Sequence, residues 1–149
     1  GAKWRWMVFD LDIAFGYAKL GAKALVDYNS IEHATAENSG NWYNFDCSTL
    51  MLRSLLKNKT FRKRFVERYL ELSQTIFAPQ HILDRINAFE ALYAPEMENH
   101  IDRWGYPKSM EVWRNNIGDM RSYAKERPFY FEKYLEEYLG SSLENVVKE

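Results

Sequence analysis

The sequence predicts a mainly α fold, a multi-helix array with one or two short β-strands at the N-terminus. Residues 3–15 alternate between two faces with the period of a strand. From position 46 onward, apolar residues recur every three or four positions, and proline or glycine separates the segments. With 149 residues the chain is long enough for one domain and too short for two full ones, so we expect a single domain over residues 1–149.

The predicted strand at 3–15 carries the strongest chemical signal of the chain. One of its faces runs from indole rings to carboxylates and consists of Trp4, Trp6, Val8, Asp10 and Asp12. On a strand, Asp10 and Asp12 point to the same side, about 6–7 Å apart. Such a pair can hold Mg²⁺ against phosphate oxygens, which indicates phosphate chemistry. The alternative interpretation is an acidic turn that merely ends a strand.

Residues 16–45 show no sustained period and are predicted to form a long loop. Small and polar residues interrupt the segment at Gly21, at Asn29-Ser30 and through 37–41. Loops of this length in compact domains are usually functional or mobile. Glu32, His33 and Glu37 lie in this loop, but nothing in the pattern assigns them a role.

Three helices are predicted between positions 46 and 94. Asp46 or Ser48 caps the first, which runs to about Asn58. Thr60 caps the second, which Ala78-Pro79 ends, and Pro79 occupies the first turn of the third. The second helix has the apolar stripe Phe61, Phe65, Tyr69, Leu72 and Ile76, and the third has Ile82, Ile86, Phe89 and Tyr93.

Prolines are expected to divide the remaining helical region, 46–140, into short pieces. Pro95 predicts a kink or a break, followed by a short helix over Glu96–Trp104. After a turn at 105–107, Ser109 begins a helix that Arg127-Pro128 closes. A last helix is predicted from about Phe129 to Leu139, ending at Gly140, and residues 141–149 are too short to assign.

The composition excludes several classes of partner. Twenty Lys and Arg against 21 Asp and Glu give a net charge of −1, so neither a nucleic acid nor an anionic membrane is expected as a partner. No apolar run approaches 18 residues, so no transmembrane segment is expected. Cys47 is the only cysteine, which excludes an internal disulfide, and its place at the start of an apolar helix predicts a small buried residue.

A few further residues have both a functional and a purely structural interpretation. The basic stretch from Lys57 to Arg68 could steer an acidic partner, but a solvated helix face is favoured because its aromatic residues fall on the apolar stripe. Glu96 and His100, one helical turn apart, could hold a metal or form an ordinary surface pair. Arg103 and Arg127 could bind phosphate, although Arg127 before Pro128 is more simply a helix-terminal cation that complements the dipole.

Two families share parts of this pattern. Val8-Phe9-Asp10-Leu11-Asp12 resembles the first motif of the haloacid-dehalogenase phosphatases, but that family places Gly-Thr after the second Asp, where this chain has Ile13-Ala14. It also needs a doubly wound parallel sheet, whereas 46–140 supply helices. A longer resemblance is to the CotH spore-coat kinase family of atypical kinases. It is carried by Lys3-Trp4-Arg5-Trp6, by 9–16, by Leu52 to Phe65, by Ala94-Pro95-Glu96-Met97 with His100 and Arg103-Trp104, and by Met120-Arg121 with Arg127.

The CotH resemblance implies roles for the N-terminal strand. Asp12 would be the counterpart of the metal-binding Asp that protein kinases place in Asp-Phe-Gly, with Mg²⁺ on it bridging the phosphates of ATP. Asp10 would be a second ligand or would orient Asp12. Trp6 lies on the same face and could stack on the adenine ring, or it could be a core residue. The implied activity is phosphoryl transfer from ATP to a protein hydroxyl, and a spore-coat or cell-surface location follows from the same resemblance.

The resemblance also implies parts that these 149 residues do not contain. The loop over the phosphates, the cation on the α- and β-phosphates and the general base belong, in this family, to a nucleotide-binding lobe upstream of a segment like Lys3–Asp12. We therefore expect this chain to be the C-terminal part of a larger kinase-like protein, inactive alone. The main alternative is a noncatalytic helical scaffold or interaction module of a surface or coat assembly.

Overall fold

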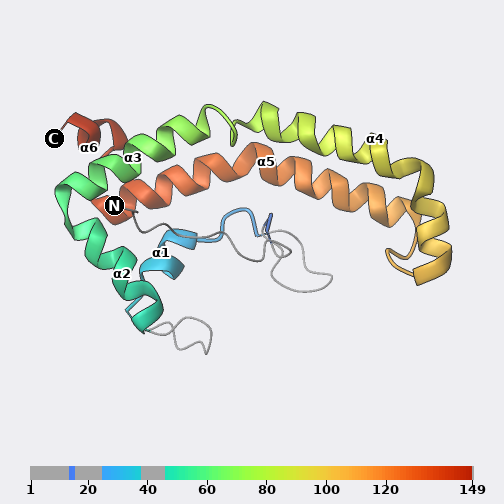
Figure 1. Cartoon of the computed structure of the whole chain (residues 1–149), viewed down its shortest axis with the longest axis horizontal. Coiled ribbons are helices and arrows are strands. Elements are labelled where there is room, and N and C mark those ends of the chain that lie inside the picture. Colours follow the sequence, from blue (N-terminus) through green and yellow to red (C-terminus); the bar gives the residue numbers. More distant parts are fainter. Residues whose placement is uncertain (1–13, 16–24, 38–45, 149) are drawn as a thin grey trace, which may run out of the picture.

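The computed structural model describes residues 14–15, 25–37 and 46–148 (Figure 1). Within these ranges all regular secondary structure is helical, which confirms the mainly α class. The predicted strand lies outside the described residues except for its last two positions. The helices are α1 (Ser30–Thr35), α2 (Asp46–Lys57), α3 (Lys59–Ser73), α4 (Pro79–Trp104), α5 (Met110–Leu139) and α6 (Leu143–Lys148).

Helix α1 lies inside the segment predicted to be a loop, so that prediction was wrong for residues 30–35. Asn29 caps the helix, because its Oδ1 accepts a hydrogen bond from the Glu32 amide at 2.9 Å. Of its six residues Ile31 alone is buried. One buried residue in six gives no apolar period, which is why the pattern did not reveal this helix.

Helices α2 and α3 confirm the predicted pair, with a different boundary between them. The cap of α3 is Asn58 and not Thr60: its side chain accepts a hydrogen bond from the Phe61 amide at 3.0 Å. The helix ends at Ser73, five residues before the predicted stop at Ala78-Pro79. Ile76 therefore belongs to the turn that follows and is exposed.

Neither internal proline ends a helix. Helix α4 runs for 26 residues with Pro95 inside it, and α5 runs for 30 residues with Pro128 inside it. The separate helices predicted at Glu96–Trp104 and Phe129–Leu139 are thus the second parts of α4 and α5. The ribbon of α4 bends in its later part (Figure 1), as the predicted kink at a proline requires. A proline in a helix interior costs about 3 kcal/mol, which the packing of a long amphipathic helix can offset.

The predicted helix ends around the long hairpin are confirmed. Ser109 caps α5 by accepting a hydrogen bond from the Val112 amide at 3.2 Å. Gly105 ends α4 with φ of 66°, and Gly140 ends α5 with φ of 64°. Both values are in the left-handed region that glycine reaches without steric cost.

Helix α5 is the element on which the others assemble (Figure 1). Its first part pairs with α4 in an antiparallel hairpin, and its last part packs beneath α3 and next to α1. Helix α6 folds back onto α3, where Leu143 and Val146 are buried. The tail that the sequence left unassigned is therefore part of the core.

Two clusters of buried side chains lie along α5. The first joins the four helices α1, α3, α5 and α6 through Ile31, Val66, Leu135, Leu143 and Val146. The second lies in the hairpin and consists of Ile86, Ile117 and Ala124. Since both clusters contain residues of α5, the stability of the two ends of the molecule is coupled through this one helix.

Truncation of the first cluster should destabilise the whole domain. Leu135 is fully buried, so we expect Leu135→Ala to lower the free energy of unfolding by about 2–5 kcal/mol. The matched control is Phe129→Ala on the same helix, because the Phe129 side chain is 68% exposed. Urea unfolding followed by circular dichroism measures both, and equal losses would contradict the assignment of the core.

Candidate functional site

The residues predicted to form the phosphate site, Trp6, Asp10 and Asp12, lie outside the described residues. The structure does describe Phe15, three positions after Asp12. Phe15 has a φ of 60°, a left-handed conformation that is rare for a residue with a bulky side chain. Its ring lies against Tyr123 of α5, with ring centroids 5.6 Å apart. The described end of the candidate metal segment is therefore held by the middle of α5.

Phe15 also packs on the hairpin core. It packs against the buried cluster of Ile86, Ile117 and Ala124, as Ile82, Leu83 and Trp113 also do. Burial of an aromatic ring in this cluster contributes more than the strained backbone conformation costs. The packing fixes where the chain that follows the carboxylate pair meets the helices.

Arg127 attaches a second segment to the same helix. Its Nη1 donates hydrogen bonds to the backbone carbonyl oxygens of Val26 at 2.9 Å and Tyr28 at 2.6 Å. Its Nη2 donates to the Ser30 hydroxyl at 2.6 Å. The planar guanidinium presents several donors in fixed directions, which suits this set of acceptors. Because α5 continues past residue 127, the prediction that Arg127 complements a helix end was wrong.

Tyr134 completes this attachment one to two turns further along α5. Its hydroxyl donates to the carbonyl oxygen of Asp27 at 2.7 Å. Tyr123, Arg127 and Tyr134 are four and seven positions apart, so they lie on one flank of the helix. The sequence analysis did not find this row, because it treated Pro128 as a helix end. The apolar spacing of Ile117, Ala124, Phe131 and Leu135 across Pro128 is the signal that could have revealed it.

Two cavities flank α1. The larger is an open cavity of about 570 Å³, and the smaller, on the side facing Tyr134 and Tyr138, is about 290 Å³. In the larger one the Tyr28 hydroxyl and His33 Nδ1 are 2.8 Å apart. The residues that line it are Leu25, Asp27, Tyr28, Asn29, Glu32, His33 and Ala36. Glu32 and His33, to which the sequence assigned no role, thus lie together at a cavity wall.

Helix α1 is tied to α2 by polar contacts. The Thr49 hydroxyl donates to the carbonyl oxygen of Ala36 at 2.6 Å, and Thr49 itself is buried. Arg53 pairs with Glu37 at 3.0 Å and donates to the Thr49 hydroxyl at 3.2 Å. Glu37 is accordingly a structural residue in this arrangement.

The metal interpretation of Glu96 and His100 gains no geometric support. Both side chains are exposed, and the Glu96 carboxylate accepts a hydrogen bond from the side-chain amide of Asn99 at 2.9 Å. Over the part of the chain that the structure describes, no three His, Cys, Asp or Glu side chains gather in a way that could hold a metal ion. Cys47 is exposed at the start of α2, so the prediction of a buried cysteine was wrong.

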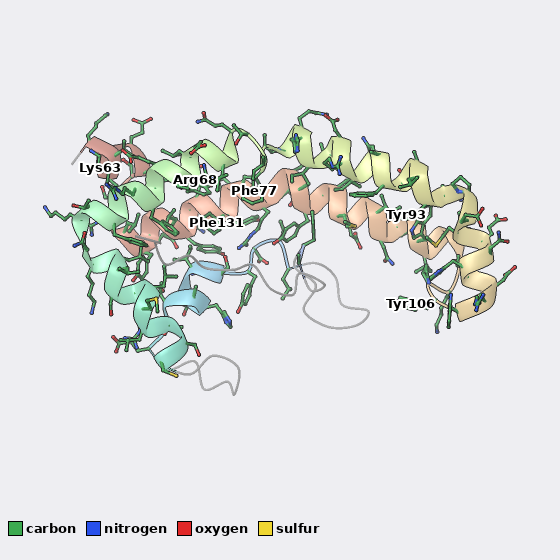
Figure 2. The ribbon with its side chains drawn as sticks, in the orientation of Figure 1. Lys63, Arg68, Phe77, Tyr93, Tyr106 and Phe131 are labelled. Atoms are coloured by element: carbon green, nitrogen blue, oxygen red, sulfur yellow. The ribbon has the colours of Figure 1, made fainter. Side chains whose placement is uncertain are left out.

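The other basic candidates lie at the surface. The Arg103 guanidinium stacks over the Trp104 ring, 5.1 Å from its centroid. Along α3, Arg68 pairs with Glu71 at 2.6 Å, and Figure 2 shows Lys63 and Arg68 on the outside of this helix. The exposed members of the basic stretch are Lys57, Lys59, Arg64 and Arg68. This is the solvated helix face that the sequence favoured.

Tyr69 carries a buried hydroxyl near the row formed by Tyr123, Arg127 and Tyr134, which we term the Arg127 row. Its ring lies 4.9 Å from that of Phe131, and its hydroxyl has no hydrogen-bond partner among the described residues. The pKa of Tyr69 is raised to about 12, chiefly by burial and also by the nearby Glu132 carboxylate, against an opposing effect of Arg127. The hydroxyl therefore stays protonated at any physiological pH.

Comparison with known proteins gives one match. A family model described as CotH kinase protein matches residues 1–131. Neither a search of curated proteins nor a search of solved structures returns a significant match. No helix in the described ranges is long and apolar enough to cross a membrane.

Replacement of Arg127 tests the attachment of residues 26–30 to α5. Arg127→Lys keeps the charge but loses the planar set of donors, so we expect amide hydrogen exchange over 25–36 to accelerate about tenfold. Arg103→Lys is the matched control, since the side chain of Arg103 stacks on its exposed neighbour Trp104, at the far end of the hairpin from residues 25–36. Exchange that stays the same in Arg127→Lys would show that these hydrogen bonds do not hold the segment.

Replacement of Tyr69 tests the buried hydroxyl. The pKa in the folded state lies above the value of about 10 in the unfolded state, so the unfolded chain loses its proton first as pH rises. The contribution of Tyr69 to stability is thus complete below about pH 10 and falls as pH rises toward 12.

We expect Tyr69→Phe to reduce this alkaline loss and to leave the free energy of unfolding at pH 7 unchanged or about 1 kcal/mol higher, because no hydrogen bond is lost. Urea titrations at pH 7 and pH 11 measure the effect. Tyr138→Phe, at an exposed position of α5, should leave the pH dependence as it is, and a strongly destabilised Tyr69→Phe would reveal a partner for the hydroxyl.

Proposed function

This chain belongs to the CotH kinase family, and from that membership we propose that it supplies the metal-binding part of a phosphotransferase. The reaction proposed is transfer of the γ-phosphoryl group of ATP to a hydroxyl group of a protein substrate. The family match is the observation that carries the proposal. It extends over residues 1–131 and so includes Trp6, Asp10, Asp12 and most of the helical array.

Asp12 is proposed as the principal Mg²⁺ ligand, with Asp10 as a second ligand or as its orienting neighbour. Carboxylate oxygens are the hard donors that Mg²⁺ prefers, so the residue types fit this ion. When bound, Mg²⁺ would neutralise charge on the phosphates during transfer. Trp6 is proposed to stack on the adenine ring, because an indole offers a large flat apolar surface.

The packing of Phe15 supports this proposal. Consecutive Cα atoms are 3.8 Å apart, so whatever the path between them, the Cα of Asp12 is at most about 11 Å from that of Phe15. Phe15 in turn contacts Tyr123 and the hairpin core. The carboxylate pair is thereby tethered to a rigid helix pair, as a ligand set needs if it is to keep its geometry during catalysis.

The contacts of Arg127 with Val26 and Tyr28, which follow residues 16–24, also support the proposal. Phe15 lies at Tyr123, and Val26 and Tyr28 lie at Arg127, one helical turn further along α5. The chain therefore contacts α5 at Phe15 and again at Val26 and Tyr28, at two side chains of α5 that are one turn apart. We infer that Arg127 and Tyr134 position this segment next to the metal site.

A second candidate function is a noncatalytic helical scaffold in a surface or coat assembly. The observation that favours it is the number of large apolar side chains left in solvent on the hairpin, among them Leu92 and Trp104 at 65% exposure each. Such side chains can mark binding surfaces. In this alternative, Asp10 and Asp12 only end a segment, and a coat or surface location is part of both proposals.

Substitution of the proposed ligand separates the two functions. Asp12→Asn in the full-length protein removes one carboxylate charge with little change in shape, so Mg²⁺-dependent binding of ATP should fall by at least about tenfold. Isothermal titration calorimetry with and without Mg²⁺ measures this. Asp102→Asn, at an exposed position of α4, is the matched control and should bind as the parent does. Unchanged binding and phosphoryl transfer in Asp12→Asn would favour the scaffold.

A further inference from the structure

One flank of the α4–α5 hairpin exposes a row of large apolar side chains, which we term the apolar flank. It consists of Phe89, Leu92 and Tyr93 of α4 and Met120 of α5, with exposed fractions of 46, 65, 53 and 37%. Figure 2 labels Tyr93 on the hairpin, far from α1 and α2. The rings of Phe89 and Tyr93 stack, with centroids 6.1 Å apart, so the row is continuous.

The opposite flank of the hairpin is polar and already paired. Arg121 of α5 donates to Asn87 Oδ1 at 2.7 Å and forms an ion pair with Glu90 of α4. Asn87 and Phe89 are two positions apart, as are Arg121 and Tyr123, which is a rotation of about 200° around each helix. Phe89 and Tyr123 therefore lie together on the flank away from the Arg121 network.

The apolar flank continues a surface that is covered elsewhere. Phe15 covers it at Tyr123, and residues 26–30 cover it at Arg127 and Tyr134. Phe89 follows Ile86, a member of the cluster on which Phe15 packs, by one helical turn towards the tip of the hairpin. Towards α1 this side of α5 is occupied by residues 26–30. Towards the tip the Arg85 guanidinium lies over the Phe89 ring, 5.1 Å from its centroid, while Phe89, Leu92 and Tyr93 remain exposed.

We propose that the apolar flank is the docking surface for the chain segment before Phe15, residues 4–13. This segment adjoins an established contact and is rich in apolar residues: those that alternate with the carboxylate pair are Met7, Phe9, Leu11 and Ile13. Burial of such side chains against Phe89, Leu92 and Tyr93 removes apolar surface of both partners from water.

The covalent reach of the segment is sufficient. From Phe15 back to Trp4 there are eleven residues, which span at most about 36–40 Å. From Ile86 to Tyr93 along α4 the rise is only about 10 Å. The docking is independent of whether Asp12 binds Mg²⁺, and it would give α4 a part in holding the candidate metal segment.

Side-chain labelling of the unmodified chain tests the docking. In hydroxyl-radical footprinting, Phe89, Leu92 and Tyr93 should react about threefold more slowly than their described exposure predicts, because residues 4–13 shield them. Phe129, 68% exposed on a different flank of α5, is the internal reference and should react at its predicted rate. Rates for all four residues that match their exposure would overturn the proposal.

Dilution and cross-linking identify the occupant. Protection by the chain's own segment is independent of concentration, whereas protection that disappears on dilution would assign the flank to a second copy and contradict us. In a Cys47→Ser background, Met7→Cys with Leu92→Cys should cross-link through a short bis-maleimide within one chain. Met7→Cys with Phe129→Cys is the matched control pair, and equal cross-linking of both pairs would also overturn the proposal. Neither readout depends on ATP or Mg²⁺, so failure here leaves the Asp12 experiment to be judged separately.

Discussion

The continuity of α5 through Pro128 is the constraint on which the rest of this structure depends. A helix of 30 residues extends about 45 Å, long enough to contribute to both buried clusters. If the helix ended at Arg127, Tyr134 would not lie on the same flank as Tyr123 and Arg127. The backbone carbonyl oxygens of residues 26–28 would then not meet the donors of Arg127 and Tyr134 together. The local cost of the proline is small beside the tertiary contacts that a continuous helix makes possible.

The helical class and most helix ends could be predicted from local sequence. Ser109, Pro79 and the glycines at 105 and 140 act through their own backbone or side-chain groups, so their effect is visible without the fold. The break at Pro128 and the separate helix after Pro95 were wrong, although the alternative of a kink at Pro95 fits the bend of α4. A proline's local penalty is fixed, whereas the packing energy that offsets it depends on residues far away in sequence. Helix α1 was missed for a related reason, since its stability comes from Asn29 and from contacts with α2 and α5.

The candidate site also combines features that local sequence predicts with features that depend on the fold. The spacing of Asp10 and Asp12 is a local property, and the chemistry proposed for them follows from sequence and from family membership alone. What surrounds the segment is set by long-range contacts: Arg127 reaches carbonyl oxygens about a hundred positions earlier in the chain. No periodicity contains that information, because the acceptors are backbone groups that every residue carries.

Phe15 and Val26, on either side of residues 16–24, are both attached to α5, so the stability of the fold depends little on the number of residues between them. Phe15 and Val26 are both held by side chains of α5 that are one turn apart, so a longer connection would still begin and end at the same two places. Doubling the number of residues in a flexible connection costs only about 0.6 kcal/mol in closure entropy. Insertions or deletions between these two attachments should therefore change the stability of the helices little.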